Sequence, residues 1–185
     1  EGHGTEIRLS SEVLAGCWDA LLSGRADLAI GAPGDMPPGG GLSTHPLGSV
    51  GFVFAIAPDH PLASLPEPLS AAQIGQHRAI VLADTTRGLA ARSSGVISGQ
   101  SRLAVPSAEC KAAAHVAGLG VGHLPRHLAD PEVARGRLVI RQTTEPRPAV
   151  MLQLAWRSDH TGKAMAWMIE RLINNPLITE PGQNN

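Results

Sequence analysis

The sequence has 185 residues, of which 43% are hydrophobic and 17% are charged, and its formal net charge is −1. This composition is typical of a globular chain rather than a disordered one, and the balanced charge offers no basic face for nucleic acid. No apolar run approaches the roughly 18 residues that a membrane-spanning helix requires, so we expect no membrane partner.

The N-terminal stretch EGHGTEIRLS has neither the basic start nor the apolar run of a secretion signal. The chain has two cysteines, Cys17 and Cys110, and each lies in an apolar helical pattern. Buried, reduced thiols are typical of cytosolic proteins. We therefore expect a cytoplasmic protein.

Strand patterns alternate with helix patterns along the chain. A short strand at 6–9 precedes a helix with Ser10 or Ser11 as its N-cap and Gly24 as its C-terminal cap. Further helices are expected at 71–74, 108–118, 126–136 and 162–176, and further strands at 26–32, 52–57, 79–84, 102–107, 119–125, 137–142 and 149–157. This alternation favours an α/β fold with mainly parallel sheets.

The stretch HVAGLGVGHLP (115–125) has three glycines at alternate positions. A phosphate-binding loop follows a strand and begins a helix, whereas here the helix comes first and Gly118 ends it. The other two glycines, Gly120 and Gly122, lie in the following strand pattern. Glycines inside a strand indicate close approach by another backbone or by a ligand.

Open α/β sheets bind ligands beyond the carboxyl ends of their strands. The residues expected there supply hydroxyls, backbone N–H groups, one guanidinium and one imidazole, and they are Ser10, Ser11, Ala32, Pro33, Asp84, Thr85, Thr86, Arg87, Ser107, Gly122 and His123. Structural roles compete with ligand contact at each: the serines as N-caps, the threonines as turn residues, Arg87 as a surface charge and His123 as a packed strand residue. The set suits a small anion or a phenolic compound.

The sequence indicates no catalytic or metal site and no cofactor. His123 and His127 are four residues apart, but Pro125 lies between them and begins the next helix, so the two do not share one face. No nucleophile-elbow pattern is present, and Asp84 is the one carboxylate among the expected strand ends.

Four segments together resemble the effector-binding domain of LysR-type transcriptional regulators. They are WDALLSGRADLAIGA (18–32), FVFAIAPDHPLA (52–63), VPSAECKAAAHVAGLGVGHLP (105–125) and RGRLVI (135–140), and the similarity runs in order from about residue 6 to residue 174. The family's N-terminal winged helix-turn-helix has no counterpart here, and we expect the first strand and helix of the regulatory domain to be absent as well.

The resemblance implies an α/β fold of two Rossmann-like subdomains joined by two crossover strands, periplasmic-binding-protein-like (type 2). Subdomain I would comprise 1–57 and 154–178, subdomain II would comprise 58–153, and 179–185 would form a tail. The family binds its effector in the cleft between the subdomains.

The implied function is ligand sensing by a bacterial transcription regulator, without catalysis. The partners would be a small effector (an aromatic compound or an organic acid), further copies of the chain in a dimer or tetramer, and DNA only through the absent N-terminal domain. A solute-binding protein for transport and an enzyme built on the same two-lobed fold are the alternatives.

Overall fold

The computed structural model describes residues 4–93, 95–159 and 162–174. The chain divides into two compact units. Unit 1 comprises Glu1–Ser49, Thr85–Ala91 and Val150–Asn185, and unit 2 comprises Val50–Asp84 and Arg92–Ala149. These boundaries lie eight and four residues earlier than the expected 57/58 and 153/154 junctions, and they assign 85–91 to the first unit. The identification of the units with regulatory subdomains I and II stays a prediction.

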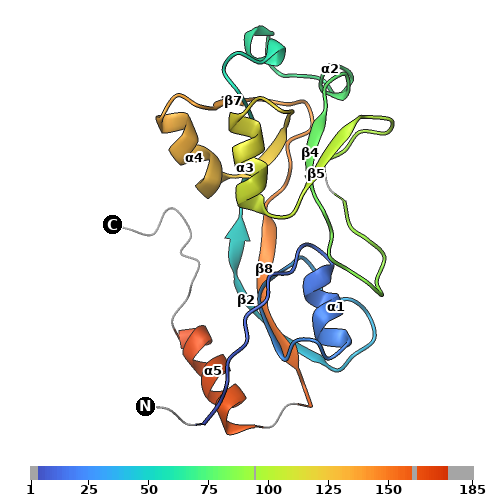
Figure 1. Cartoon of the computed structure of the whole chain (residues 1–185), viewed down its shortest axis with the longest axis vertical. Coiled ribbons are helices and arrows are strands. Elements are labelled where there is room, and N and C mark those ends of the chain that lie inside the picture. The colour runs from blue at the N-terminus through green and yellow to red at the C-terminus, as the bar shows by residue number, and fades with distance from the viewer. Residues whose placement is uncertain (1–3, 94, 160–161, 175–185) are drawn as a thin grey trace. The chain divides into compact units, whose positions relative to one another are not determined.

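Unit 1 contains a three-stranded sheet in the order β1-β8-β2. Its elements are α1 (Gly16–Leu22), β1 (Leu28–Pro33), β2 (Leu42–Val50), β8 (Val150–Arg157) and α5 (Lys163–Asn174). Strands β1 and β8 are antiparallel, and their register shifts between Ile30 and Ala32. Helix α1 packs against both of these strands (Figure 1), and its Trp18 and Leu21 are fully buried with Ala32 and Ala155.

The expected strand at 6–9 and the helix start at Ser10 or Ser11 are wrong. Residues 6–9 form no strand, both serines are exposed, and α1 begins at Gly16 after Ala15. Two features of the folded chain delay the start of the helix. The Val13 N–H donates to the Thr85 hydroxyl, and Leu14 adopts a left-handed φ of 54° that a right-handed helix cannot include.

Unit 2 contains a three-stranded sheet in the order β6-β3-β7 and a two-stranded sheet of β4 and β5. Its elements are β3 (Phe52–Ile56), the 3-10 helix η1 (Pro61–Ser64), α2 (Ala71–Gly75), β4 (Ala79–Leu82), β5 (Arg102–Val105), α3 (Ala108–Val116), β6 (Gly122–Pro125), α4 (Arg126–Ala134) and β7 (Val139–Arg141). Figure 1 shows α3 between α4 and β4, and α3 packs on both.

Sheet direction differs from the sequence-based expectation. The described ladders β1–β8, β3–β6 and β3–β7 are antiparallel, and β4–β5 is parallel. The expectation of mainly parallel sheets is therefore wrong. Sequence analysis also missed β2, whose Pro46 cannot donate a ladder hydrogen bond; β2 lies at an edge of its sheet, where proline is tolerated.

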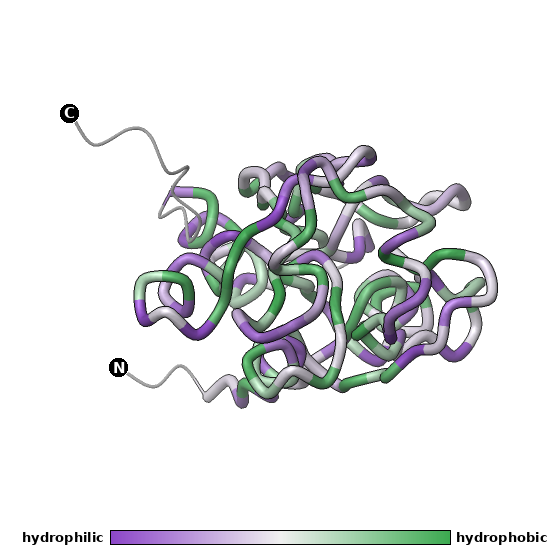
Figure 2. Tube along the Cα trace, turned by 90° about the horizontal axis from the view of Figure 1, so that it is seen from above, coloured by the Kyte–Doolittle hydropathy of each residue, from purple (hydrophilic) through white to green (hydrophobic). Residues whose placement is uncertain are grey.

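Strand β3 is buried on both faces, which explains its uninterrupted apolar sequence. One face carries Val53 and Ala55, which pack with Leu124, Ala112, Ala129 and Leu138. The other face carries Phe54 and Ile56, which pack with Leu62, Leu69 and Val121. Along the trace, short apolar and polar stretches alternate (Figure 2). Within the described residues, no helix is long and apolar enough to span a bilayer.

The alternate glycines after α3 allow two backbones to approach. Gly118, at φ 68°, follows the C-cap residue Ala117 of α3 and ends the helix. A Cβ on Gly120 would lie 2.4 Å from the Arg78 carbonyl oxygen. Val121 then donates to that same oxygen at 2.8 Å and accepts from the Ile80 N–H at 2.9 Å. These glycines therefore serve the pairing of the segment before β6 with β4.

Candidate functional site

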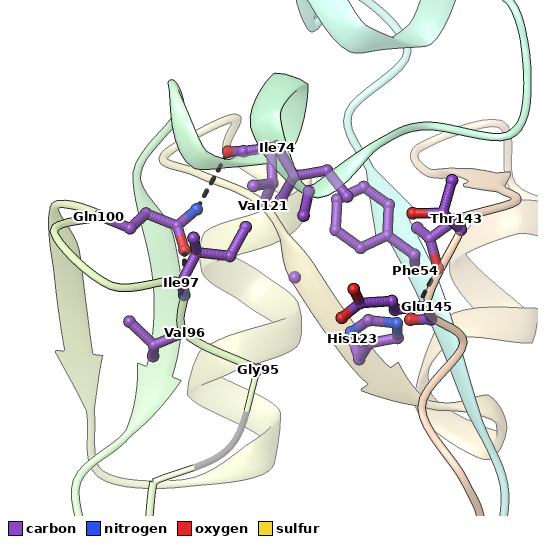
Figure 3. Close-up of a pocket in the computed structure, with 13 residues that line it drawn as sticks. Phe54, Ile74, Gly95, Val96, Ile97, Gln100, Val121, His123, Thr143 and Glu145 are labelled. Atoms are coloured by element: carbon purple, nitrogen blue, oxygen red, sulfur yellow. Dashed lines mark hydrogen bonds between the residues drawn. The ribbon is translucent and has the colours of Figure 1, made fainter.

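Unit 2 contains a hollow of about 290 Å³, called here the Gln100 hollow. Its apolar wall is formed by Phe54, Ala71, Ile74, Val96, Ile97 and Val121, and its polar residues are Gln100, His123, Thr143, Thr144 and Glu145, with Gly95 and Gly122. In Figure 3, Phe54, Thr143 and Glu145 lie on one side, and Val96, Ile97 and Gln100 lie on the other.

The amide of Gln100 is occupied by structural hydrogen bonds. Its Nε2 donates to the carbonyl oxygens of Ile74 at 3.0 Å and His77 at 2.8 Å, and its Oε1 accepts from the Ile97 N–H at 3.0 Å. This side chain therefore fixes the wall of the hollow (Figure 3) and has little capacity left for a ligand.

A second hollow of about 310 Å³ adjoins the first and shares Phe54, His123 and Thr143 with it. We call it the Arg147 hollow. Its other described lining residues are Phe52, Val53, Ile140, Arg141, Gln142, Pro146 and Arg147. This lining therefore combines two phenylalanines with two guanidinium groups and contains no carboxylate.

His123 lies between the two hollows. Its ring packs edge-on against Phe54, with centroids 5.4 Å apart and the planes at 73°, because the two residues are register partners on β6 and β3. Burial, followed by the charges of Arg147 and Lys111, lowers the pKa of His123 to about 4. The imidazole is therefore neutral at pH 7 and presents one donor and one acceptor nitrogen.

Two further basic residues of α3 are buried near this site. Lys111 is 5% exposed, and burial, followed by the charge of Arg147, lowers its pKa to about 8. His115 is fully buried, and its Nδ1 lies 2.7 Å from the Ala55 carbonyl oxygen. Because a carbonyl only accepts, Nδ1 carries the proton. The Nε2 of His115 has no hydrogen-bond partner within the described residues, and burial lowers the pKa of the ring to about 4.

Two of the sequence-predicted residues of unit 1, Thr85 and Arg87, are held by structural hydrogen bonds. The Thr85 hydroxyl donates to the Glu12 carboxylate, and the buried Asp19 carboxylate accepts the N–H groups of Arg87 and Gly88, both at 3.1 Å. These hydrogen bonds, led by that from Arg87, lower the pKa of Asp19. The 85–91 segment is thereby tied to α1, while the Arg87 side chain is exposed.

The remaining predicted residues are divided between structural positions and the hollows. Ala32 is buried inside β1, and the Pro33 carbonyl accepts from the Trp18 indole N–H at 3.1 Å. Thr86 turns the chain through hydrogen bonds with Leu89. The competing structural readings of Thr85 and Thr86 therefore have direct support.

In unit 2, Ser107 caps α3 by accepting from the Cys110 N–H at 3.1 Å, and Asp84 accepts from the Arg92 N–H at 2.6 Å. Neither lines either hollow within the described part of the chain, whereas Gly122 and His123 do. Cys110 is exposed, contrary to the expectation of a buried thiol. Over residues 4–93, 95–159 and 162–174, no cluster of three or more His, Cys, Asp or Glu residues is placed to hold a metal ion.

Sequence reasoning missed Lys111 and Arg147. Lys111 lies in an alanine-rich helix, where a single lysine reads as an exposed charge. Arg147 lies between two prolines in EPRPAV, which reads as a surface loop. One feature of the sequence singles out Lys111: the chain has only two lysines, Lys111 and Lys163.

Comparison with known proteins identifies the family. Residues 2–175 match the family described as LysR substrate binding domain. The chain is 38% identical over 135 residues to the HTH-type transcriptional activator AllS of Klebsiella pneumoniae, covering 73% of this chain and 50% of AllS. It is 33% identical over 174 residues to the uncharacterized HTH-type transcriptional regulator YeeY of Escherichia coli (strain K12), covering 94% of this chain and 56% of YeeY.

Among solved structures, the fold is similar to the regulatory domain of CcmR from Synechocystis PCC6803 in complex with 2-PG. The TM-score is 0.61 at 17% identity, and the match covers 85% of this chain and 77% of that one. The predicted α/β, periplasmic-binding-protein-like (type 2) fold class is thereby confirmed. The chain spans about half the length of the two curated relatives. With 174 of its residues matched by the family and a third of them identical in a relative, this chain belongs to the LysR substrate binding domain family.

Proposed function

We propose that this chain is the ligand-sensing part of a longer DNA-binding transcription regulator, that it works in the cytoplasm and that it performs no catalysis. The observation that carries the proposal is the family match over residues 2–175. This chain covers about half the length of two relatives that are named as HTH-type transcriptional regulators. A regulatory domain of similar fold was solved in complex with 2-PG.

The mechanism follows from population shift. A ligand changes an equilibrium between two conformations only by the difference in its affinity for them. Binding to this chain would favour one conformation of a dimer or tetramer, and that conformation would set the spacing of DNA-binding modules elsewhere in the protein. This chain has a net charge of −1, so we expect it to make no DNA contact of its own.

His123 is the strongest of the predicted ligand contacts. It lines both hollows of unit 2, is neutral at pH 7 and is flanked by Phe54. A neutral imidazole with an apolar wall suits a small aromatic compound or organic acid. Ser107, which belongs to the same unit, stays in the proposal as a secondary contact.

A thermal-melt screen tests this function. About a hundred small organic acids and phenols are added to the purified chain, and a ligand at 100 times its Kd is expected to add about 2.7 kcal/mol to stability. The His123→Ala variant should lose the shift, whereas His127→Ala, which removes an exposed imidazole from α4, should keep it.

Two results would contradict the proposal. Turnover of the stabilising compound would indicate an enzyme, and the absence of any saturable shift across the screen would remove the ligand-sensing function. A shift that survives in His123→Ala would retain the function and place the ligand away from His123.

A further inference from the structure

The Arg147 hollow holds two arginines that differ in their partners. The Arg141 guanidinium has structural partners: it donates to the carbonyl oxygens of Ala63 and Leu65 and pairs with the Glu67 carboxylate at 2.8 Å. It therefore joins β7 to the segment around η1 and has a structural role.

Arg147 has a different environment. Its guanidinium carbon lies 3.9 Å from the centroid of the Phe52 ring, and the ion pairs of the described residues do not include it. The attraction between a guanidinium and an aromatic ring uses none of the N–H donors as a conventional hydrogen bond, and paired N–H donors of a guanidinium match the two oxygens of a carboxylate.

Lys111 adds a second positive charge. Its residue is 5% exposed, and it too is missing from the ion pairs of the described residues. The positive charges of Arg147 and Lys111 both lower the pKa of His123. A buried cation is normally paired, and a buried lysine without an anion raises the free energy of the fold.

The surroundings favour one class of anion. Phe52, Phe54 and Ile140 give the hollow an apolar wall, and the T-shaped pair of Phe54 and His123 leaves ring edges and faces for stacking. The adjoining Gln100 hollow, by contrast, includes the Glu145 carboxylate, which would repel an anion.

We propose that the Arg147 hollow binds the carboxylate of a small aromatic acid, with Arg147 as the bidentate contact and with Phe52 and Phe54 against the ring. This inference rests on the proposed ligand-binding function, and it specifies the effector class and the contact residue.

The test is an NMR and calorimetric titration of the chain with sodium benzoate, and benzamide serves as the uncharged control of the same shape. Benzoate is expected to bind at least ten times more tightly than benzamide and to move the signals of Phe52, His123 and Arg147. Bound carboxylate offsets the neighbouring positive charges, so the pKa of His123, followed by NMR, should rise on saturation.

Variants assign the contact. Arg147→Gln should weaken benzoate binding at least tenfold, and Arg147→Lys, which keeps the charge without the fork, should weaken it by less. Arg102→Gln, which changes an exposed arginine on β5 of the same unit, should bind benzoate like the original chain. Melting temperature and circular dichroism confirm that each variant is folded.

Benzoate binding that is no tighter than that of benzamide, or that survives in Arg147→Gln, would overturn the proposal. This result is distinguishable from failure of the proposed function. If the screen finds a ligand but benzoate does not bind, the carboxylate site is wrong and ligand sensing stands. If benzoate binds through Arg147 and is turned over, the site stands and the sensing function fails, because turnover indicates an enzyme.

Discussion

Lys111 and His115 lie one turn apart on α3, and both are basic groups that the fold buries. Burial disfavours the charged form of each, which is why their pKa values fall. The His115 ring has a partner in the Ala55 carbonyl, whereas the ion pairs of the described residues offer Lys111 no carboxylate. At the residue scale, Lys111 is therefore the less favourable of the two for stability.

Lys111→Met should stabilise the chain at pH 7 by about 1 to 3 kcal/mol, because methionine has a similar length and removes the buried charge. In the unchanged chain the folded-state pKa of about 8 lies below the unfolded value of about 10.4. The unfolded state thus binds more protons between these values, and stability rises with pH across that window. Urea denaturation at several pH values measures both effects.

Lys163→Met is the matched control, because Lys163 is the other lysine of the chain and lies exposed at the start of α5. It should change the free energy of unfolding by less than about 0.5 kcal/mol. A destabilised Lys111→Met variant would mean that the ammonium group is held by interactions that outweigh its burial.

At the scale of elements, the contact between β4 and the segment before β6 requires a residue without a side chain. The Val121 N–H reaches the Arg78 carbonyl at 2.8 Å because Gly120 has no Cβ to occupy the space beside that oxygen. The same two-backbone contact brings β6, and with it His123, to its place beside β3.

Gly120→Ala should lower the free energy of unfolding by about 1 to 3 kcal/mol, since the added methyl group would lie 2.4 Å from a carbonyl oxygen and one backbone must move. Gly51→Ala in the same unit is the control, because nothing lies within 4 Å of a Cβ there, and it should be close to neutral. Equal stability of the two variants, measured by urea denaturation, would show that the β4–β6 contact yields without strain.

At the scale of the whole molecule, stability depends on pH through the buried histidines. The folded-state pKa of His115 is about 4, and the unfolded value is about 6.5. Between these values the unfolded chain binds a proton that the folded chain does not, so stability is lost as pH falls from about 6.5 to about 4.

As pH falls from about 6.5 to about 4, His115 should lower the free energy of unfolding by at most about 3 kcal/mol. His115→Asn, which keeps a donor for the Ala55 carbonyl but does not titrate, should show a smaller decrease over this range in urea denaturation. His127→Asn, which changes an exposed histidine, should follow the original profile. An unchanged slope in His115→Asn would assign the acid sensitivity to other groups.

Prediction from the sequence succeeded where the determinants are local. The helix at 108–118, its serine cap and its glycine end match α3, because capping depends on residues within one turn. Prediction failed at Ser10 and Ser11, whose cap pattern was overridden by a hydrogen bond from Val13 to Thr85, 72 residues away. It also failed at β2, since only the order of the sheet shows that Pro46 lies in an edge strand.

The sequence by itself determined the family, the α/β class, most of the helices and strands, and His123 as a ligand candidate, because periodicity, caps and motif order are written in neighbouring residues. Only the tertiary structure decided the directions of the strands, the structural roles of Thr85 and Ser107, the burial of Lys111 and the meeting of His123 with Arg147. Lys111, His123 and Arg147 come from a helix, a strand and a loop spread over 37 residues of sequence. Only the folded chain removes Lys111 from solvent and brings His123 and Arg147 into one hollow with Phe52 and Phe54.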